Sequence, residues 1–196
     1  MTKGEETKAA VLSEALDMAS IEGFEGLSIG ALAARTGMSK SGLFAHFGSE
    51  EQLQLATLQT GVSRFTEVVI DRALQAPRGL GRVQALFENW LEWATKLGPS
   101  GGCVLLAASV EWDDKEGPVR DYLVKAQNNW LAVLAGAAKR AVGNKEFRED
   151  LDCELFANEL NATYLNFHMA TRLLRDPKAR DRARQAFARL LEDARC

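Results

Sequence analysis

Apolar residues along the chain recur at steps of three and four, the spacing of one face of an α-helix. Two long apolar stripes run over residues 83–97 and 119–141. Sustained alternation of β-branched residues, the signal of a strand, is almost absent. We therefore predict an all-α protein with about nine helices, near residues 5–22, 28–36, 40–46, 50–75, 80–97, 103–113, 118–142, 152–175 and 178–193.

The expected helices are uneven in length, because three short helices come first and longer ones follow. The four prolines fall between the periodic segments, where they separate helices. This order predicts an N-terminal three-helix module in residues 1–48, joined to a larger C-terminal helical bundle in residues 49–196.

Composition narrows the class of protein. Of the 196 residues, 46% are hydrophobic and 26% are charged, which is typical of a globular protein with a sizeable core. The polar N-terminus does not resemble a signal peptide, and no apolar run approaches the ~20 residues that cross a membrane. Cys103, Cys153 and Cys196 lie far apart without a CxxC spacing. We therefore expect a cytoplasmic protein with no disulfide framework, no metal and no cofactor.

The stretch "LAARTGMSKSGLFAHFGSEEQL" (residues 32–53) predicts two short helices separated by a glycine. Ser28 and Ser39 are suited to cap the two helices, and Gly37 supplies the left-handed turn between them. From the second helix, Leu43, Phe44 and Phe47 are expected to point back towards the first.

Two short helices joined in this way form a helix-turn-helix, whose second helix fits the DNA major groove. A plain helical hairpin is the structural alternative. Gly42 argues against it, because a glycine inside a helix costs about 1 kcal/mol relative to alanine. Close approach to DNA gives a reason for that glycine.

Charge limits how such a module can bind DNA. The net charge is −3, and residues 1–50 hold four basic against seven acidic residues. DNA binding must therefore use a local patch rather than a general basic field.

The segment "GLSIGALAARTGMSKSGLFAHFGSEEQL" resembles the DNA-binding module of the TetR-type (tetracycline-repressor-like) transcriptional regulators, over about residues 8–55. "GGCVLLAASVEWDDKEGPVRDYL" is similar to the sixth and seventh helices of many members. The resemblance implies a homodimeric, ligand-responsive regulator, in most members a repressor, that binds a double-stranded DNA operator. It also implies the DNA-contacting residues, namely Ser28, Ser39, Lys40, Ser41, Gly42, Phe44 and His46.

Two positions depart from the family pattern. Phe44 stands where a tyrosine is common, so the aromatic ring is kept and a phosphate donor is lost. Glu50 stands where a lysine is common; its carboxylate suits the helix N-terminus but repels a phosphate. Both departures imply weak non-specific binding to DNA, or else dependence on a long, well-matched operator.

The resemblance also implies a small-molecule effector pocket within about residues 55–175. The candidate lining residues are Phe87, Trp90, Trp93, Leu106, Trp112, Trp130, Tyr164, Phe167 and His168. Aromatic residues at helical spacing more often form a core, so both interpretations stay open. Glu111, Asp113 and Asp114 beside Trp112 favour a cationic ligand, or form a solvated surface.

The last two helices predict a homodimer interface within residues 152–193. The first is apolar on more than one side, and the second carries small alanines that allow close packing. The arginines of this segment are expected to form a solvated rim. A second function stays open, that of a helical enzyme or small-molecule carrier whose helix-turn-helix no longer binds DNA, although no catalytic motif is recognisable.

Overall fold

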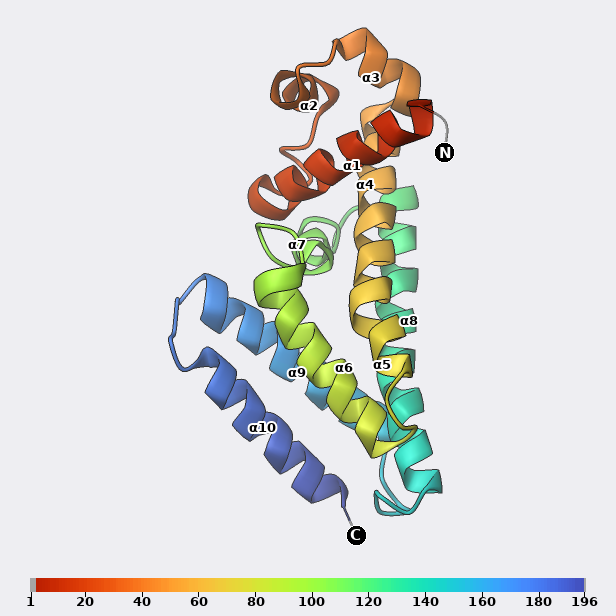
Figure 1. Ribbon diagram of the computed structural model, residues 1–196, viewed down its shortest axis with the longest axis vertical. Helices are drawn as coiled ribbons and strands as arrows, with labels where there is room; N and C mark the ends of the chain where they lie inside the picture. The colour runs from red at the N-terminus through yellow and green to blue at the C-terminus, as the bar shows by residue number, and fades with distance from the viewer. Residues whose placement is uncertain (1–2, 196) are drawn as a thin grey trace. The chain divides into compact units, whose positions relative to one another are not determined.

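The computed structural model describes residues 3–195, which contain helices and no strand (Figure 1). The helices α4, η1 and α5 follow one another without a break, as do α6 and η2, so these residues form nine continuous helices. Met1, Thr2 and Cys196 lie outside the described residues, so the expectations that involve them are not addressed. The bounds are α1 Lys3–Glu22, α2 Ile29–Thr36, α3 Lys40–Phe47, α4 Glu50–Phe65, η1 Thr66–Asp71, α5 Arg72–Leu74, α6 Leu80–Glu92, η2 Trp93–Leu97, α7 Val104–Glu111, α8 Pro118–Gly143, α9 Cys153–Arg172 and α10 Ala179–Ala194.

The all-α prediction and the helix positions are confirmed, with small differences at the ends. The largest difference is at α9, which ends at Arg172 rather than near residue 175. Arg175 has a φ of 50°, a left-handed conformation that cannot continue a right-handed helix. Two segments also differ in kind, because η1 and η2 are π-helical turns within otherwise α-helical rods. None of the helices in residues 3–195 is long and apolar enough to span a membrane.

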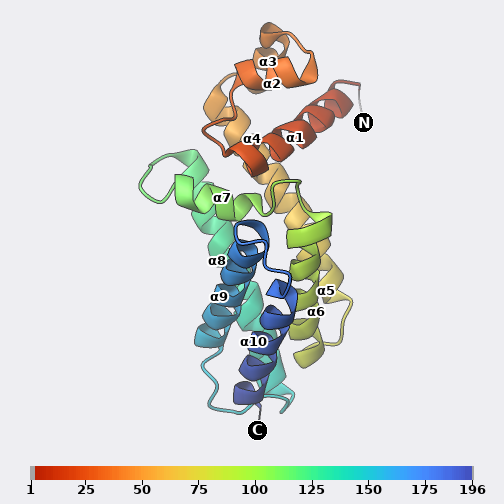
Figure 2. The same cartoon turned by 90° about the vertical axis from the view of Figure 1, so that its left-hand side faces the viewer.

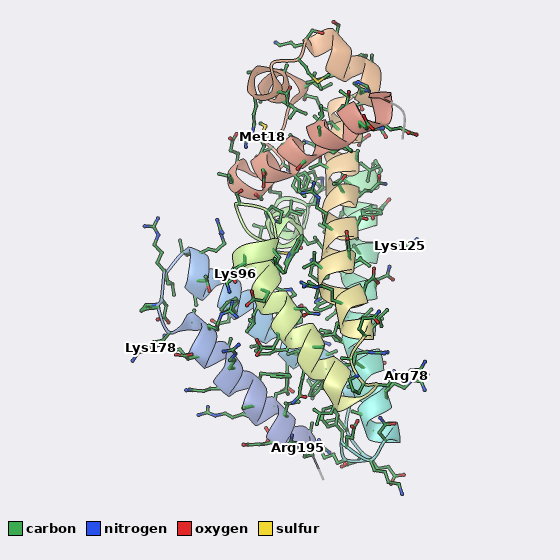
Figure 3. All side chains as sticks on the ribbon, viewed as in Figure 1. Met18, Arg78, Lys96, Lys125, Lys178 and Arg195 are labelled. Carbon is green, nitrogen blue, oxygen red and sulfur yellow. The ribbon has the colours of Figure 1, made fainter. Side chains whose placement is uncertain are left out.

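The chain packs as two compact units, and the first consists of residues up to Arg64 together with Gly98–Ala126. In this unit α1, α2 and α3 gather around the start of α4 (Figures 1 and 2). Its core includes Leu16, Phe24 and Met18, the last of which is labelled in Figure 3. At Gly61 of α4 a β-carbon would lie 2.6 Å from Val104 Cγ1 of α7, so this glycine lets α4 and α7 approach closely.

The second unit consists of Phe65–Leu97 and the residues from Gln127 onwards. Here α9 and α10 run side by side, as both ribbon views show (Figures 1 and 2). Arg184 pairs with Glu88 of α6 at 2.8 Å, and Arg180 pairs with Glu92 at 2.9 Å. The two pairs tie α10 to α6. Arg180 is half-buried, unlike the expected solvated rim, whereas Arg184 stays exposed as expected.

The expected division of the chain between residues 48 and 49 is a functional one, and it stays a prediction. The packing units divide the chain elsewhere, because the helix-turn-helix packs together with the first half of α4 and with α7. The sequence pattern did not indicate that residues 98–126 fold with the N-terminal module.

Gly101 provides a test of the packing in the first unit. A β-carbon at this position would lie 1.8 Å from the carbonyl oxygen of Ser20, at the end of α1. We predict that Gly101→Ala lowers the free energy of unfolding by about 1–3 kcal/mol, the usual cost of overpacking. Gly136 of α8 is exposed and has nothing within 4 Å of its added β-carbon, so Gly136→Ala should raise the free energy by up to about 1 kcal/mol. Urea unfolding followed by circular dichroism measures both, and an unchanged midpoint for Gly101→Ala would contradict the close packing.

Candidate nucleic-acid interface

The first helix of the expected motif, α2, begins at a capping serine. Ser28 has an extended backbone, and its hydroxyl oxygen accepts a hydrogen bond from the Ala31 N–H at 3.1 Å. This bond satisfies one of the free N–H groups at the helix start. Ile29, Leu32 and Ala33 are buried and anchor the helix to the core. The predicted capping role of Ser28 is thus confirmed, while its contact with DNA stays a prediction.

A glycine turn and a second cap connect α2 to α3. Gly37 adopts a φ of 69°, which a glycine reaches without steric cost. Ser39 then caps α3, because its Oγ accepts a hydrogen bond from the Gly42 N–H at 3.1 Å. Leu43 and Phe47, four residues apart, are both buried and hold α3 against the rest of the unit. In Figure 1 α2 is seen nearly end-on while α3 runs across the view, so the pair has the steep crossing of a helix-turn-helix.

The outer face of α3 presents most of the expected DNA-contacting residues to solvent. Ser39, Lys40 and Ser41 are exposed on the first turn, and Gly42 and His46 are half-buried. The Ser39 and Ser41 hydroxyl oxygens lie 3.2 Å apart. With Phe44 included, the fold therefore brings six of the seven residues onto one short helix and its cap, in the arrangement that places polar groups against base edges.

Phe44 differs from its expected position. Its side chain is 57% exposed, so it does not point back towards α2. The physical reason is the helical period: Leu43 and Phe47 occupy the inner face, and the next residue after Leu43 lies about 100° further round. An exposed phenylalanine on this face is available for contact with another molecule.

Gly42 also has a structural role that the sequence argument missed. A β-carbon at this position would lie 3.1 Å from Ser39 Oγ, tighter than most real contacts. Glycine here leaves room for the capping hydroxyl of Ser39. The close approach to DNA that this glycine would allow stays a prediction.

Positive charge gathers at the start of α2. Lys40 Nζ lies 3.6 Å from where a β-carbon of Gly30 would be, in the first turn of that helix. Helix N-termini carry a partial positive charge, so a lysine beside one favours a phosphate group. Arg35, by contrast, donates to Glu14 at 3.0 Å and is largely neutralised. Lys40 thus supplies a local basic patch in a segment that is acidic overall.

The following helix begins with acidic residues. Ser49 accepts a hydrogen bond from the Gln52 N–H at 3.1 Å and so caps α4. Glu50 and Glu51 are exposed in the first turn, where the helix dipole favours them. The structure therefore explains the departure at Glu50 as a folding advantage.

Residues of α7 and its flanking loops hold the end of α1 in place. The two carboxylate oxygens of Glu111 accept hydrogen bonds from the backbone N–H groups of Phe24 and Glu25, each at 2.9 Å. Trp112 packs edge-on against Phe24, with ring centroids 4.9 Å apart. Lys115 pairs with Glu25 and lowers the pKa of that carboxyl, through a hydrogen bond and through its charge.

This arrangement changes the interpretation of the acidic run at residues 111–114. Both Glu111 oxygens are already occupied, and the ammonium group of Lys115 lies 5.3 Å from the Trp112 ring centroid. Asp113 and Asp114 are exposed. Glu111 and Trp112 therefore serve the packing of the first unit, and Asp113 and Asp114 form a solvated surface. Periodicity gives no sign of a contact across 87 residues, so the sequence could not have revealed the role of Glu111.

The candidate effector-binding residues are divided between the two units. Leu106 and Trp112 lie in the first unit, and the other seven lie in the second. Of these seven, Phe87, Trp90, Trp93, Trp130, Tyr164 and Phe167 are buried, and His168 is half-buried. Burial, together with Arg172, lowers the pKa of His168. Residues 3–195 contain no group of three His, Cys, Asp or Glu side chains that could hold a metal ion.

The chain matches two family models. One, described as bacterial regulatory proteins of the tetR family, covers residues 11–57. The other, described as the tetracyclin repressor-like C-terminal domain, covers residues 79–187. None of the curated proteins matches the chain significantly.

Similar solved structures share the fold at low sequence identity. A TetR transcriptional regulator from Chloroflexus aurantiacus is 24% identical, with a TM-score of 0.87 over 98% of this chain and 96% of that one. A regulator from Saccharomonospora viridis in complex with choline is 20% identical, with a TM-score of 0.81 over 96% of both chains. AibR, in complex with isovaleryl coenzyme A and operator DNA, is 21% identical, with a TM-score of 0.70 over 93% of this chain and 95% of that one.

Lys40 provides a test of the basic patch. Lys40→Ala removes the cation beside the start of α2, so we predict weaker binding to a DNA duplex and a flatter dependence on salt. Each lost phosphate contact should reduce the slope of log affinity against log salt by about 0.9 for each chain bound. Lys178→Ala, at an exposed lysine on the loop before α10 (Figure 3), is the matched control and should leave the slope unchanged. Equal slopes for both variants, measured by fluorescence anisotropy, would place the phosphate contact elsewhere.

Proposed function

Because this chain belongs to the TetR family of bacterial regulatory proteins, we propose that it is a repressor that binds its operator through α3 and leaves the operator when a small effector binds. Members of this family are DNA-binding transcriptional regulators that respond to ligands and act as dimers. The observation that carries the proposal is the short helix α3, capped by Ser39 and held from behind by buried Leu43 and Phe47.

The residues of α3 and α2 have distinct proposed roles at the DNA. Lys40 and the N-terminus of α2 bind a phosphate, with Ser28 beside them. Ser39 and Ser41 hydrogen-bond to base edges or phosphates, and Gly42 lets the helix approach. Phe44 makes an apolar contact in the major groove, such as with a thymine methyl group, and His46 lies nearer the backbone. The exposure of Phe44 and the position of Lys40 beside Gly30 support these assignments.

The effector is proposed to bind among the aromatic residues of the second unit. AibR in complex with isovaleryl coenzyme A and operator DNA shows that a chain of this fold can hold both kinds of partner. A conformational change caused by effector binding would reach the DNA-binding module along the chain, because η2 leads directly into residues 98–103. Those residues are fastened to α1: Ser20 Oγ accepts from the Gly101 N–H at 2.8 Å, and Asp17 accepts from the Ser100 N–H at 3.0 Å. The expected cytoplasmic location stays a prediction.

A titration that follows emission and operator binding together tests this function. Three of the four tryptophans lie in the second unit, so an effector bound there should change tryptophan emission and release the operator with the same midpoint. Trp112→Phe, which removes the tryptophan of the first unit, should keep the emission response. A compound that changes emission but leaves the operator bound would indicate a carrier instead.

The dimer interface is proposed to lie on α9 and α10. Leu165 and Met169 of α9 and Leu173, its C-cap, follow one another at steps of four, and all three are exposed in the single chain. Exposed apolar side chains that line one helix face are typical of a surface covered by a partner. A second copy of this chain covers them by two-fold symmetry.

Leu165→Glu should therefore give monomers, since burying an unpaired charge costs several kcal/mol. Leu74 of α5 is equally exposed, at 48% against 46% for Leu165, so Leu74→Glu is a matched control that should stay dimeric. Sedimentation velocity distinguishes the two states. Monomers should also lose operator binding, because two half-sites must be held together. If Leu165→Glu remains dimeric, the interface does not lie on this face of α9.

A further inference from the structure

Among the described residues, five buried polar atoms of the second unit have no hydrogen-bond partner, on Arg82, Trp93, Tyr164, His168 and Thr171. Two of these side chains, Trp93 and Tyr164, are almost completely buried. Tyr164 is 0% exposed and Trp93 is 1% exposed. Among the described residues, neither the Tyr164 hydroxyl nor the Trp93 indole N–H meets a partner. Buried polar groups in folded proteins are nearly always paired, so the two exceptions in fully buried aromatic side chains need a reason. Both groups can donate a hydrogen bond, and the indole can only donate.

Both groups belong to one aromatic cluster, formed by Phe65, Phe87, Trp90, Trp93, Trp130 and Tyr164. The Trp90 ring stacks on Tyr164 with centroids 4.5 Å apart, and Trp130 lies 5.8 Å from Tyr164. Phe65 is edge-on to both Trp93 and Trp130, at 5.6 and 5.0 Å. Trp130 offers an internal comparison, because its own indole N–H donates to Asn161 Oδ1 at 3.1 Å. The indole N–H of Trp130 therefore has a hydrogen-bond acceptor, whereas that of Trp93 has none among the described residues.

The helices lose regular α-geometry beside this cluster. The π-helical turn η1 begins directly after Phe65, and η2 begins at Trp93 itself. The Asn89 amide donates to the carbonyl oxygen of Val69 within η1 at 3.1 Å. Short π-helical turns inside α-helices are rare and are frequent at functional sites. The location of the two π-helical turns is an observation separate from the unpaired donors. It indicates the same aromatic cluster as a functional site.

The charges near the cluster limit what it can bind. Glu88 and Glu92 of α6 are paired with Arg184 and Arg180. Burial, and then the charge of Glu88, raises the pKa of Tyr164, so the phenol keeps its proton. No lysine or arginine belongs to the cluster, and an anionic ligand would therefore be buried without a counter-charge. A cationic group would bring no acceptor for the two donors.

We propose that the effector is an uncharged, largely apolar organic molecule with carbonyl or ether oxygens that accept hydrogen bonds from Trp93 and Tyr164. In the bound state, the apolar part of this molecule replaces some of the ring-to-ring contacts within the aromatic cluster. This inference rests on the proposed function only in that the ligand is taken to be the effector. Binding itself is tested without DNA.

The test uses four matched probes of one shape: 2-acetylnaphthalene, its acceptor-free analogue 2-isopropenylnaphthalene, the anion 2-naphthoate, and the cation naphthyltrimethylammonium. A second set built on a single benzene ring covers smaller sites. Calorimetry should show the ketone binding about five- to tenfold more tightly than the acceptor-free analogue, the usual gain from a hydrogen bond. The ketone should also bind more tightly than either charged probe.

Two conservative variants connect this preference to the named atoms. Tyr164→Phe and Trp93→Phe each remove one donor and should each reduce the preference for the ketone. Tyr122→Phe removes the same hydroxyl from the only other tyrosine and should keep it. In the protein labelled with nitrogen-15, the ketone should move the indole N–H resonance of Trp93 downfield by more than that of Trp130, whose N–H already donates to Asn161. A Trp93→Phe spectrum assigns the peak, and the spectra also show whether each variant is folded.

The proposal is overturned if neither ketone binds, if the acceptor-free analogue binds as tightly, or if a charged probe binds best. It is also overturned if folded Tyr164→Phe and Trp93→Phe both keep the preference. Operator release is measured separately with the ketone that binds. A ketone that binds with the expected preference and leaves the operator in place supports the ligand class while contradicting the effector role. A charged compound that releases the operator supports the regulator and overturns this ligand class.

Discussion

The position of the DNA-reading module depends on one carboxylate, that of Glu111. It accepts hydrogen bonds from two consecutive backbone N–H groups in the segment that joins α1 to α2. The amide of Gln54 donates to the carbonyl oxygen of Phe24 from the opposite side, at 2.9 Å. Gly23, with a φ of 79°, has no room for a β-carbon beside the carboxylate. Because this short segment sets where α2 and α3 begin, the geometry of the helix-turn-helix is fixed from a helix that lies far away in the sequence.

The two units use polar groups in opposite ways. In the first unit the caps and loops satisfy their hydrogen bonds, locally through Ser28, Ser39 and Ser49 and across the sequence through Glu111. In the second unit a closely packed aromatic core keeps two donors without partners. Satisfied caps favour a rigid surface that holds a fixed shape against DNA, whereas an unsatisfied core is less stable than it would be with a partner bound. This contrast suits a regulator whose first unit binds DNA of fixed shape and whose second unit responds to an effector.

The sequence predicted whatever depends on neighbours within about four residues. Apolar periodicity located all nine helices, and the pattern of Ser28, Gly37 and Ser39 located the caps and the turn. Phe44 was misplaced, although the spacing of Leu43 and Phe47 already implied its exposure. The tie from Glu111, the pairing of Arg180 and Arg184 with α6, and the placement of Trp112 in the first unit all depend on contacts between distant segments. The π-helical turns were not predicted, because the apolar pattern was interpreted as α-helical through both segments.

The π-helical turn η2 has a mechanical consequence for everything that follows it. A π-turn closes its hydrogen bonds one residue further along than an α-turn, so it holds one residue more. If η2 adopted α-geometry, that residue would be released, and the helix end after Trp93 would change phase by about 100° and slide by about 1.5 Å. The segment at residues 98–103 follows directly and is fastened to α1 by Ser20 and Asp17. A change of helical phase at η2 would therefore displace the start of a segment that is hydrogen-bonded to α1.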